Sequence, residues 1–182
     1  TLALVGFGTV GSGLLSLLSE NRKEIARKTG IDLELKYVID QDLSKLSSLK
    51  GVQISNDYRT ALNDPEVSLV VELTGGVDFP LRLFNETAAA GKHFVTANKA
   101  LLSRHLYAMF EAARKNRIYI GFEASVAGGI PIIHTLRRSL AGNRIQAIEG
   151  IINGTTNYIL TQMEEQGIDF PVALKQAQDL GF

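Results

Sequence analysis

Three glycines near the start of the chain have the spacing that a diphosphate-binding turn requires. They follow the apolar run "LALV" and precede a segment in which leucines recur at helical spacing. In a strand, turn and helix of this kind, the first glycine permits the tight turn, the second lets the backbone approach a pyrophosphate, and the third lets helix and strand pack closely. A turn without a ligand uses the same glycines, so the surrounding elements decide between the two. The predicted cofactor-binding loop comprises Gly6, Phe7, Gly8, Thr9, Val10 and Gly11.

A dinucleotide site also needs an acidic residue at the end of the second strand, where it can bind a ribose hydroxyl. Asp40 ends the run "LELKYVID" and is the candidate; a helix cap or a solvated surface position is the alternative for this residue. A carboxylate here favours NAD, because it repels the 2′-phosphate of NADP. Lys45 and Arg59 are near enough in the sequence to reach such a phosphate. We therefore expect NAD to be preferred and NADP to be tolerated.

Further candidates follow the later apolar runs, at the strand ends where ligands bind in parallel sheets. Thr74 and Gly75 follow "SLVVEL" and would let a nicotinamide ribose come close, unless they form only a turn. Lys99 follows "KHFVTA", where its ammonium could bind a substrate oxygen or carboxylate, although a solvated lysine is the ordinary alternative. Glu123 follows "RIYIGF" and begins "EASVAGGIP", in which loop carbonyls could join the carboxylate around a hard cation; a purely structural turn explains this stretch equally well.

These candidates lie between segments that alternate between strand and helix. Strands that alternate with helices imply right-handed crossovers and a parallel sheet. The predicted fold is therefore α/β, a doubly wound parallel sheet of the Rossmann type, in which each candidate lies at the carboxyl end of a strand. The apolar runs predict strands at 2–6, 33–40, 68–73, 92–97 and 117–122, and helical spacing predicts helices at 14–30, 58–62, 80–90 and 100–115.

The composition excludes several classes of function. Lys and Arg together number 19, as do Asp and Glu, so no excess charge indicates a nucleic-acid or membrane partner. The absence of cysteine excludes thiolate chemistry, including that of dehydrogenases with a thiol nucleophile. No apolar run reaches the roughly 20 residues of a membrane span and the start lacks a basic segment, so we expect a cytoplasmic protein. His93, His105 and His134 are scattered and are not expected to bind metal or to catalyse.

Five motifs, in their order and spacing, resemble the homoserine dehydrogenase family, in its single-function type. They are "GFGTVG", "VVELTGG", "GKHFVTANKALL", "FEASVAGGIPII" and "IEGIINGTTNYIL", and the resemblance runs from about Leu4 to Phe182. It implies an NAD(P)-dependent oxidoreductase that interconverts L-homoserine and L-aspartate 4-semialdehyde, on the route to threonine, methionine and isoleucine. It also implies that the enzyme is a homodimer or homotetramer.

The resemblance also implies domains and residue roles. Residues 1–125 would form the dinucleotide-binding domain and 126–182 the first part of an α+β substrate domain, with a strand at 145–153. Lys99 would contact the nicotinamide and the substrate, near Thr74. A monovalent cation such as sodium would be bound by Glu123 and the carbonyls of Val126, Gly128 and Ile130. The substrate-binding loop would comprise Asn153, Gly154, Thr155 and Thr156, although Thr155 could instead only cap the following helix.

The family pattern continues after the equivalent of Phe182 with a glutamate, an aspartate and a lysine, and that lysine is the usual proton donor. We therefore expect this chain to be a fragment that binds NAD(H) or NADP(H) but turns over slowly or not at all. Two other functions stay open. One is a nucleotide-sensing Rossmann module without catalysis, because fold does not dictate activity. The other is a different amino-acid dehydrogenase.

Overall fold

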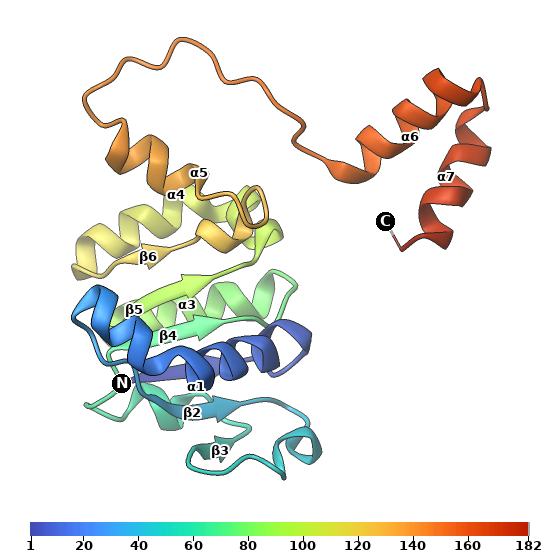
Figure 1. Cartoon of the computed structure of the whole chain (residues 1–182). Coiled ribbons are helices and arrows are strands. Elements are labelled where there is room, and N and C mark those ends of the chain that lie inside the picture. Colours follow the sequence, from blue (N-terminus) through green and yellow to red (C-terminus); the bar gives the residue numbers. More distant parts are fainter. Residues whose placement is uncertain (182) are drawn as a thin grey trace. The chain divides into compact units, whose positions relative to one another are not determined.

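The computed structural model describes residues 1–181, and its central feature is a six-stranded parallel sheet (Figure 1). The strand order is β3-β2-β1-β4-β5-β6, so β1 and β4 are neighbours at the point where the chain switches from one half of the sheet to the other. This order confirms the predicted doubly wound sheet of the Rossmann type. The strands are β1 (Leu2–Val5), β2 (Leu35–Ile39), β3 (Gln53–Ser55), β4 (Leu69–Glu72), β5 (His93–Thr96) and β6 (Ile120–Gly121).

Helices connect the strands, and local chemistry fixes where they begin and end. The Asn98 side chain accepts a hydrogen bond from the Leu101 amide (3.0 Å) and so caps the start of α4. Gly30 ends α1 in the left-handed conformation that glycine adopts without strain. No helix among the residues described is long and apolar enough to cross a membrane. The helices here are α1 (Thr9–Thr29), α2 (Arg59–Leu62), α3 (Asp78–Ala89), α4 (Lys99–Asn116) and α5 (Ile132–His134), with 3-10 turns η1 (Leu43–Leu46) and η2 (Glu123–Ser125).

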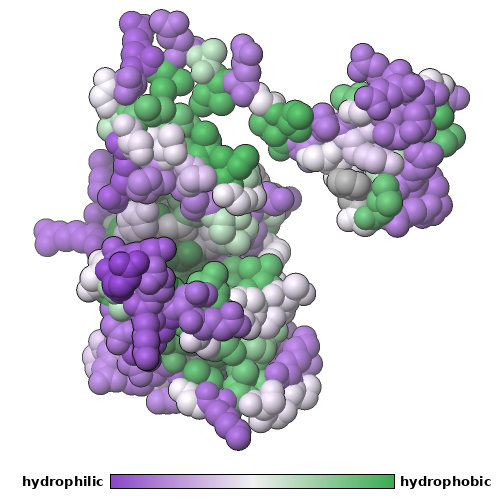
Figure 2. Space-filling model, in the orientation of Figure 1, coloured by the Kyte–Doolittle hydropathy of each residue, from purple (hydrophilic) through white to green (hydrophobic). Residues whose placement is uncertain are grey.

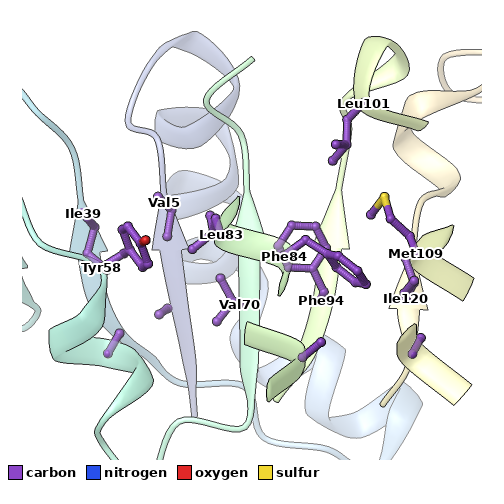
Figure 3. Close-up of a cluster of buried hydrophobic side chains, with 14 of the residues drawn as sticks. Val5, Ile39, Tyr58, Val70, Leu83, Phe84, Phe94, Leu101, Met109 and Ile120 are labelled. Carbon is purple, nitrogen blue, oxygen red and sulfur yellow. The ribbon is translucent and has the colours of Figure 1, made fainter. Parts of the chain in front are cut away.

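Alternate residues of each strand face opposite sides of the sheet, and two apolar clusters result. Leu2 and Leu4 of β1 pack with Leu18 of α1 on one face. Ala3 and Val5 of the same strand belong to a larger cluster on the other face, with residues of α2, α3 and α4. Burial on both faces explains why the strands read as continuous apolar runs. Figure 3 shows members of the larger cluster, among them Val5, Ile39, Tyr58, Val70, Leu83, Phe84, Phe94, Leu101, Met109 and Ile120.

The five predicted strands and the four predicted helices are all present, but β6 spans only Ile120–Gly121 of the predicted 117–122, and α1 begins at Thr9 and not at residue 14. The sequence did not predict β3 or η1. β3 has only three residues, and the first two of them are exposed, so no apolar run marks it. Its position is set by pairing with β2, from Tyr37 opposite Gln53 to Ile39 opposite Ser55.

Residues from Leu136 onward form a second compact unit, while Thr1–Thr135 form the first. A π-helical turn, η3 (Thr135–Ser139), lies where the two units meet along the chain. The second unit contains α6 (Gly154–Gln166) and α7 (Phe170–Asp179). These two helices pack around Ile159, Ala173 and Ala177.

The strand predicted at 145–153 is wrong, because this stretch forms no regular secondary structure. A strand needs a neighbour to pair its amide and carbonyl groups, and residues 136–181 contain no other strand. The apolar residues that suggested a strand are instead exposed on the stretch before α6, as the green atoms of Figure 2 show. They are Ile145, Ile148, Ile151 and Ile152.

Candidate functional site

A cleft of about 600 Å³ lies at the carboxyl ends of the strands, around the junction of β1 and β4. In open α/β sheets this junction is the expected ligand site, because the crossovers leave on opposite faces and open a crevice there. Five of the predicted cofactor-binding residues line it: Gly6, Gly8, Asp40, Thr74 and Gly75. The other lining residues are Val5, Ile39, Gln41, Lys45, Asn56, Asp57, Tyr58, Arg59, Leu73 and Phe79.

The three glycines of the first turn differ in what surrounds them. Gly6 has φ +100°, and a methyl group on it would lie 2.7 Å from the carbonyl carbon of Leu73. A methyl group on Gly11 would overlap the carbonyl oxygen of Gly6, so this glycine lets α1 pack against the turn. Gly8 meets no such obstacle and is exposed to the cleft. Two glycines are therefore required by the fold, and Gly8 leaves open the space that a diphosphate would occupy.

The start of α1 supports the same interpretation. Its N-cap is Gly8, no side chain caps it, and its first turn has no acidic residue. The first amides of a helix lack partners within the helix and carry the positive end of its dipole. An anion at this end would satisfy them.

Asp40 lies directly after β2 and lines the cleft, as the dinucleotide interpretation requires. Its carboxylate accepts hydrogen bonds from the amides of Phe7 (2.7 Å) and Asp42 (3.0 Å). The bond to Phe7 joins the end of β2 to the glycine turn. Asp40 is half-buried, so its charge remains accessible from the cleft.

Two cationic side chains, Lys45 and Arg59, also line the cleft near Asp40. Arg59 is held by Glu86, with a distance of 2.9 Å between the guanidinium and the carboxylate, and Glu86 also accepts the hydroxyl hydrogen of Tyr58 (2.9 Å). Burial and this carboxylate raise the pKa of the Tyr58 hydroxyl. Lys45 is exposed, and its ammonium lies 3.7 Å from the Asp42 carboxylate. Lys45 is therefore the less constrained of the two cations.

The turn after β4 is organised by a residue that the sequence reasoning missed. Glu72 is fully buried, and its Oε1 accepts hydrogen bonds from the Thr74 amide (2.7 Å), the Thr74 hydroxyl (2.8 Å) and the Gly75 amide (3.3 Å). Its Oε2 accepts from the Thr96 hydroxyl (2.5 Å). The signal was a lone carboxylate inside the apolar run "SLVVEL", since an acidic residue in a buried strand needs hydrogen-bond donors around it.

Lys99 is the first residue of α4, and it does not line the main cleft. It lines a smaller cavity of about 200 Å³ instead. Its neighbours there come from α4 and from the turn after β6; they are Leu102, Ser103, Leu106, Phe122, Ser125 and Val126. The structure therefore places Lys99 beside the predicted cation-binding loop rather than beside the glycine turn.

Glu123, the predicted cation ligand, begins η2, and its carboxylate contacts the start of α5. Its two oxygens accept hydrogen bonds from the amides of Ile133 (2.9 Å) and His134 (2.8 Å). The loop between them turns sharply, because Ala127 and Gly128 both have positive φ angles, +55° and +58°. Each carboxylate oxygen retains capacity for a second partner, while the Ile130 carbonyl already accepts a hydrogen bond from the Ile132 amide (2.8 Å). Among the residues described, no three His, Asp or Glu side chains are grouped so that they could hold a metal ion.

The predicted substrate loop lies at the start of α6 in the second unit. The Asn153 side chain caps this helix by accepting a hydrogen bond from the Thr156 amide (2.8 Å). The cap is therefore Asn153, and the alternative in which Thr155 caps the helix is wrong. Gly154 and Thr156 are exposed and Thr155 is half-buried.

Comparison with known proteins identifies the family of this chain. The family model described as "Homoserine dehydrogenase, NAD binding domain" matches residues 6–123, and the model described as "Homoserine dehydrogenase" matches residues 131–182. The chain belongs to the homoserine dehydrogenase family. It contains that family's NAD-binding domain.

Curated relatives and solved structures agree with this assignment. The homoserine dehydrogenases of Helicobacter pylori and Corynebacterium glutamicum are 44% and 41% identical to the whole chain, which covers 42% and 41% of their lengths. A crystal structure of a homoserine dehydrogenase from Thiobacillus denitrificans is 42% identical in sequence and has a TM-score of 0.90. The match covers 99% of this chain and 42% of the crystallised chain. A Staphylococcus aureus homoserine dehydrogenase is 36% identical over the whole chain, with a TM-score of 0.80. The chain thus spans about two fifths of the length of these relatives.

Proposed function

We propose that the protein is an NAD(P)-dependent oxidoreductase that interconverts L-homoserine and L-aspartate 4-semialdehyde. The observation that carries this proposal is the cleft at the junction of β1 and β4, in a chain of the homoserine dehydrogenase family. Its walls supply what a dinucleotide needs: an open backbone at Gly8, the uncapped start of α1 and the carboxylate of Asp40.

The cofactor lies along the cleft in a defined direction in this proposal. The adenosine ribose lies at Asp40, and the diphosphate lies at the turn of Gly6 to Gly11, where the amides of α1 neutralise its charge. The nicotinamide half then reaches the other side of β1, at Thr74 and Gly75, because a dinucleotide spans the junction of the two sheet halves. NAD is preferred over NADP, because the Asp40 carboxylate faces the position of a 2′-phosphate; Lys45 permits some binding of NADP.

The residues of this chain bind and orient, while the bound nicotinamide supplies the hydride. Lys99 offers an ammonium that holds an oxygen of the substrate and stabilises the negative charge that develops on it. Its exposure and its place at the start of α4 support this role. The proton donor belongs to the part of the family sequence that follows these 182 residues.

The remaining assignments complete the proposal. Residues 1–125 bind the cofactor, and 126–182 begin the substrate domain, in which Asn153, Gly154, Thr155 and Thr156 contact the amino acid. Glu123 and the carbonyls of Val126, Gly128 and Ile130 bind a monovalent cation of the sodium type. The enzyme acts in the cytoplasm as a homodimer or homotetramer.

Two measurements test the proposal. Titration of the 182-residue chain with NADH and NADPH, followed by nicotinamide fluorescence, should show saturable binding that Gly8→Val abolishes. The protein extended to the length of its relatives should oxidise NADH or NADPH when L-aspartate 4-semialdehyde is added, whereas the 182-residue chain alone should do so slowly or not at all. Cofactor binding without activity in the extended protein would favour a nucleotide-sensing module instead, and absence of binding would refute both.

A further inference from the structure

The buried Glu72 carboxylate is the centre of a hydrogen-bond network that joins three segments. One oxygen binds the turn after β4, and the other binds the hydroxyl of Thr96 at the end of β5. The same hydroxyl accepts a hydrogen bond from the Asn98 amide (2.9 Å). The Asn98 side chain then donates to the Gly76 carbonyl (2.7 Å) and caps α4, whose first residue is Lys99. The network therefore fixes the turn after β4 and the start of α4 relative to each other.

The hydrogen-bond partners of the Glu72 side chain are all donors. Its oxygens face the amides of Thr74 and Gly75 and the hydroxyls of Thr74 and Thr96, so all of their partners can donate. A buried side chain held this way is rigid, because moving any one segment would leave one of its oxygens without a hydrogen-bond partner.

The position of the network relates it to one half of the cleft. Thr74 and Gly75 line the cleft beyond β1, on the side opposite Asp40. Among the residues described, none of the network's hydrogen bonds reaches Asp40 or the glycine turn, although the backbone at Thr74 lies close to Gly6. Changes in the network should therefore affect ligands that extend past the diphosphate more than ligands that end there.

We propose that Glu72 is a positioning residue that sets the nicotinamide half of the cleft, by holding the Thr74–Gly75 turn and, through Thr96 and Asn98, the start of α4 with Lys99. This inference rests on the proposed function. It adds that the affinity for the nicotinamide half of the cofactor depends on a carboxylate that does not itself touch the cofactor.

The test compares two ligands on three variants of the 182-residue chain. NADH contains the nicotinamide half, and ADP contains only adenosine and diphosphate. Glu72→Gln keeps the size of the side chain but turns one acceptor into a donor. Thr96→Val removes one hydroxyl and is the milder change, in case Glu72→Gln does not fold. Thr87→Val is the matched control, because Thr87 is equally buried but its hydroxyl has no hydrogen-bond partner among the residues described.

We expect Glu72→Gln and Thr96→Val each to weaken NADH binding by about tenfold and to change ADP binding less than about twofold. Thr87→Val should change neither. In the extended protein, the same two variants should raise the KM for NADH and lower kcat, because Lys99 is displaced as well. Equal weakening of both ligands would show a merely structural role and overturn the inference, as would unchanged NADH binding. If the unsubstituted chain bound neither ligand, the proposed function itself would fail.

Discussion

Buried and half-buried charged side chains have different partners at the two ends of the parallel sheet. At the carboxyl ends of the strands, Asp40 and Glu72 are satisfied by backbone amides and hydroxyls. Within the residues described, neither forms an ion pair. At the amino ends, Lys36 pairs with the carboxylates of Asp64 (2.6 Å) and Glu66.

Lys36, Asp64 and Glu66 thus neutralise one another at the amino ends. The Lys36 ammonium holds the pKa of Asp64 down to about 2, and the Asp64 and Glu66 carboxylates raise the pKa of Lys36. Lys92 is buried there, and its ammonium donates to the carbonyls of Asp64 (2.7 Å) and Val67 (2.6 Å). Burial lowers the pKa of Lys92.

The amino ends of the strands therefore contribute mainly to stability, and the carboxyl ends form the candidate ligand site. Ion pairs between Lys36 and the carboxylates of Asp64 and Glu66 hold segments together at the amino ends. Asp40 and Glu72 at the carboxyl ends instead shape turns through hydrogen bonds, and the uncapped first amides of α1 remain for a ligand to meet. Four experiments test this difference between the two ends of the sheet.

The largest effect on stability is expected at the glycine turn after β1. In Gly11→Ala, the new methyl group overlaps the Gly6 carbonyl oxygen, so the free energy of unfolding should fall by about 3 kcal/mol. Gly13→Ala is the control on the same helix, because nothing lies within 4 Å of the added group. It should raise the free energy of unfolding by up to about 1 kcal/mol. Urea denaturation measures both, and similar values for the two variants would contradict the packing described here.

Two buried threonines test whether the Glu72 network stabilises the fold as well as shaping the cleft. Thr96→Val removes a donor to a buried carboxylate and should lower the free energy of unfolding by about 2 kcal/mol. Thr87→Val removes a hydroxyl that has no partner within the described chain, and should raise it by about 1 kcal/mol. Thermal unfolding of both variants gives the comparison. Destabilisation by Thr87→Val would mean that its hydroxyl is satisfied after all.

The charge of Asp40 is expected to set the choice of cofactor. Asp40→Asn keeps the side-chain shape and an acceptor for the Phe7 amide but removes the charge that would repel a 2′-phosphate. The affinity for NADPH relative to NADH should rise by about tenfold. Fluorescence titration with both cofactors measures this ratio. The control is Glu111→Gln, which removes an exposed carboxylate of α4 that does not line the cleft and should leave the ratio unchanged. An unchanged ratio in Asp40→Asn as well would remove Asp40 from the ribose site.

The smallest effect is a pH dependence at the amino ends of the strands. The folded-state pKa of Asp64, about 2, lies below its ordinary value, so this carboxylate stabilises the fold above about pH 4. That contribution is lost as the pH falls from about 4 through 2 and Asp64 becomes protonated. In Asp64→Asn, the free energy of unfolding should therefore depend less steeply on pH in this window. A slope equal to that of the unsubstituted chain would show that the ion pair with Lys36 contributes nothing.

The sequence was sufficient to predict the parts of the fold that are buried on both faces. Continuous apolar runs marked the central strands, and glycine spacing marked the first turn, because Gly6 and Gly11 are required by backbone contacts that no other residue permits. β3 could not be predicted, since pairing with β2 rather than its own three residues defines it. The strand expected at 145–153 failed for the opposite reason: its apolar pattern is present, but no neighbouring strand exists among residues 136–181.

The site could be predicted where a residue's role follows from its place after a strand. Asp40, Thr74 and Gly75 line the cleft because parallel strands bring their carboxyl ends together. Lys99 follows β5 in the same way, yet the start of α4 directs it to a different cavity. Glu72 was missed because its role depends on Thr96, which is distant in the sequence and adjacent only across the sheet.

The uncapped start of α1 couples the stability of the folded chain to the binding of its ligand. A helix that starts at Gly8 without a side-chain cap begins with amides that only solvent or an anion can satisfy. Any dinucleotide that docks there binds the native chain and not the unfolded one, so the melting temperature should climb with ligand concentration. The supply of cofactor would then regulate how long the polypeptide survives, in addition to how fast it works.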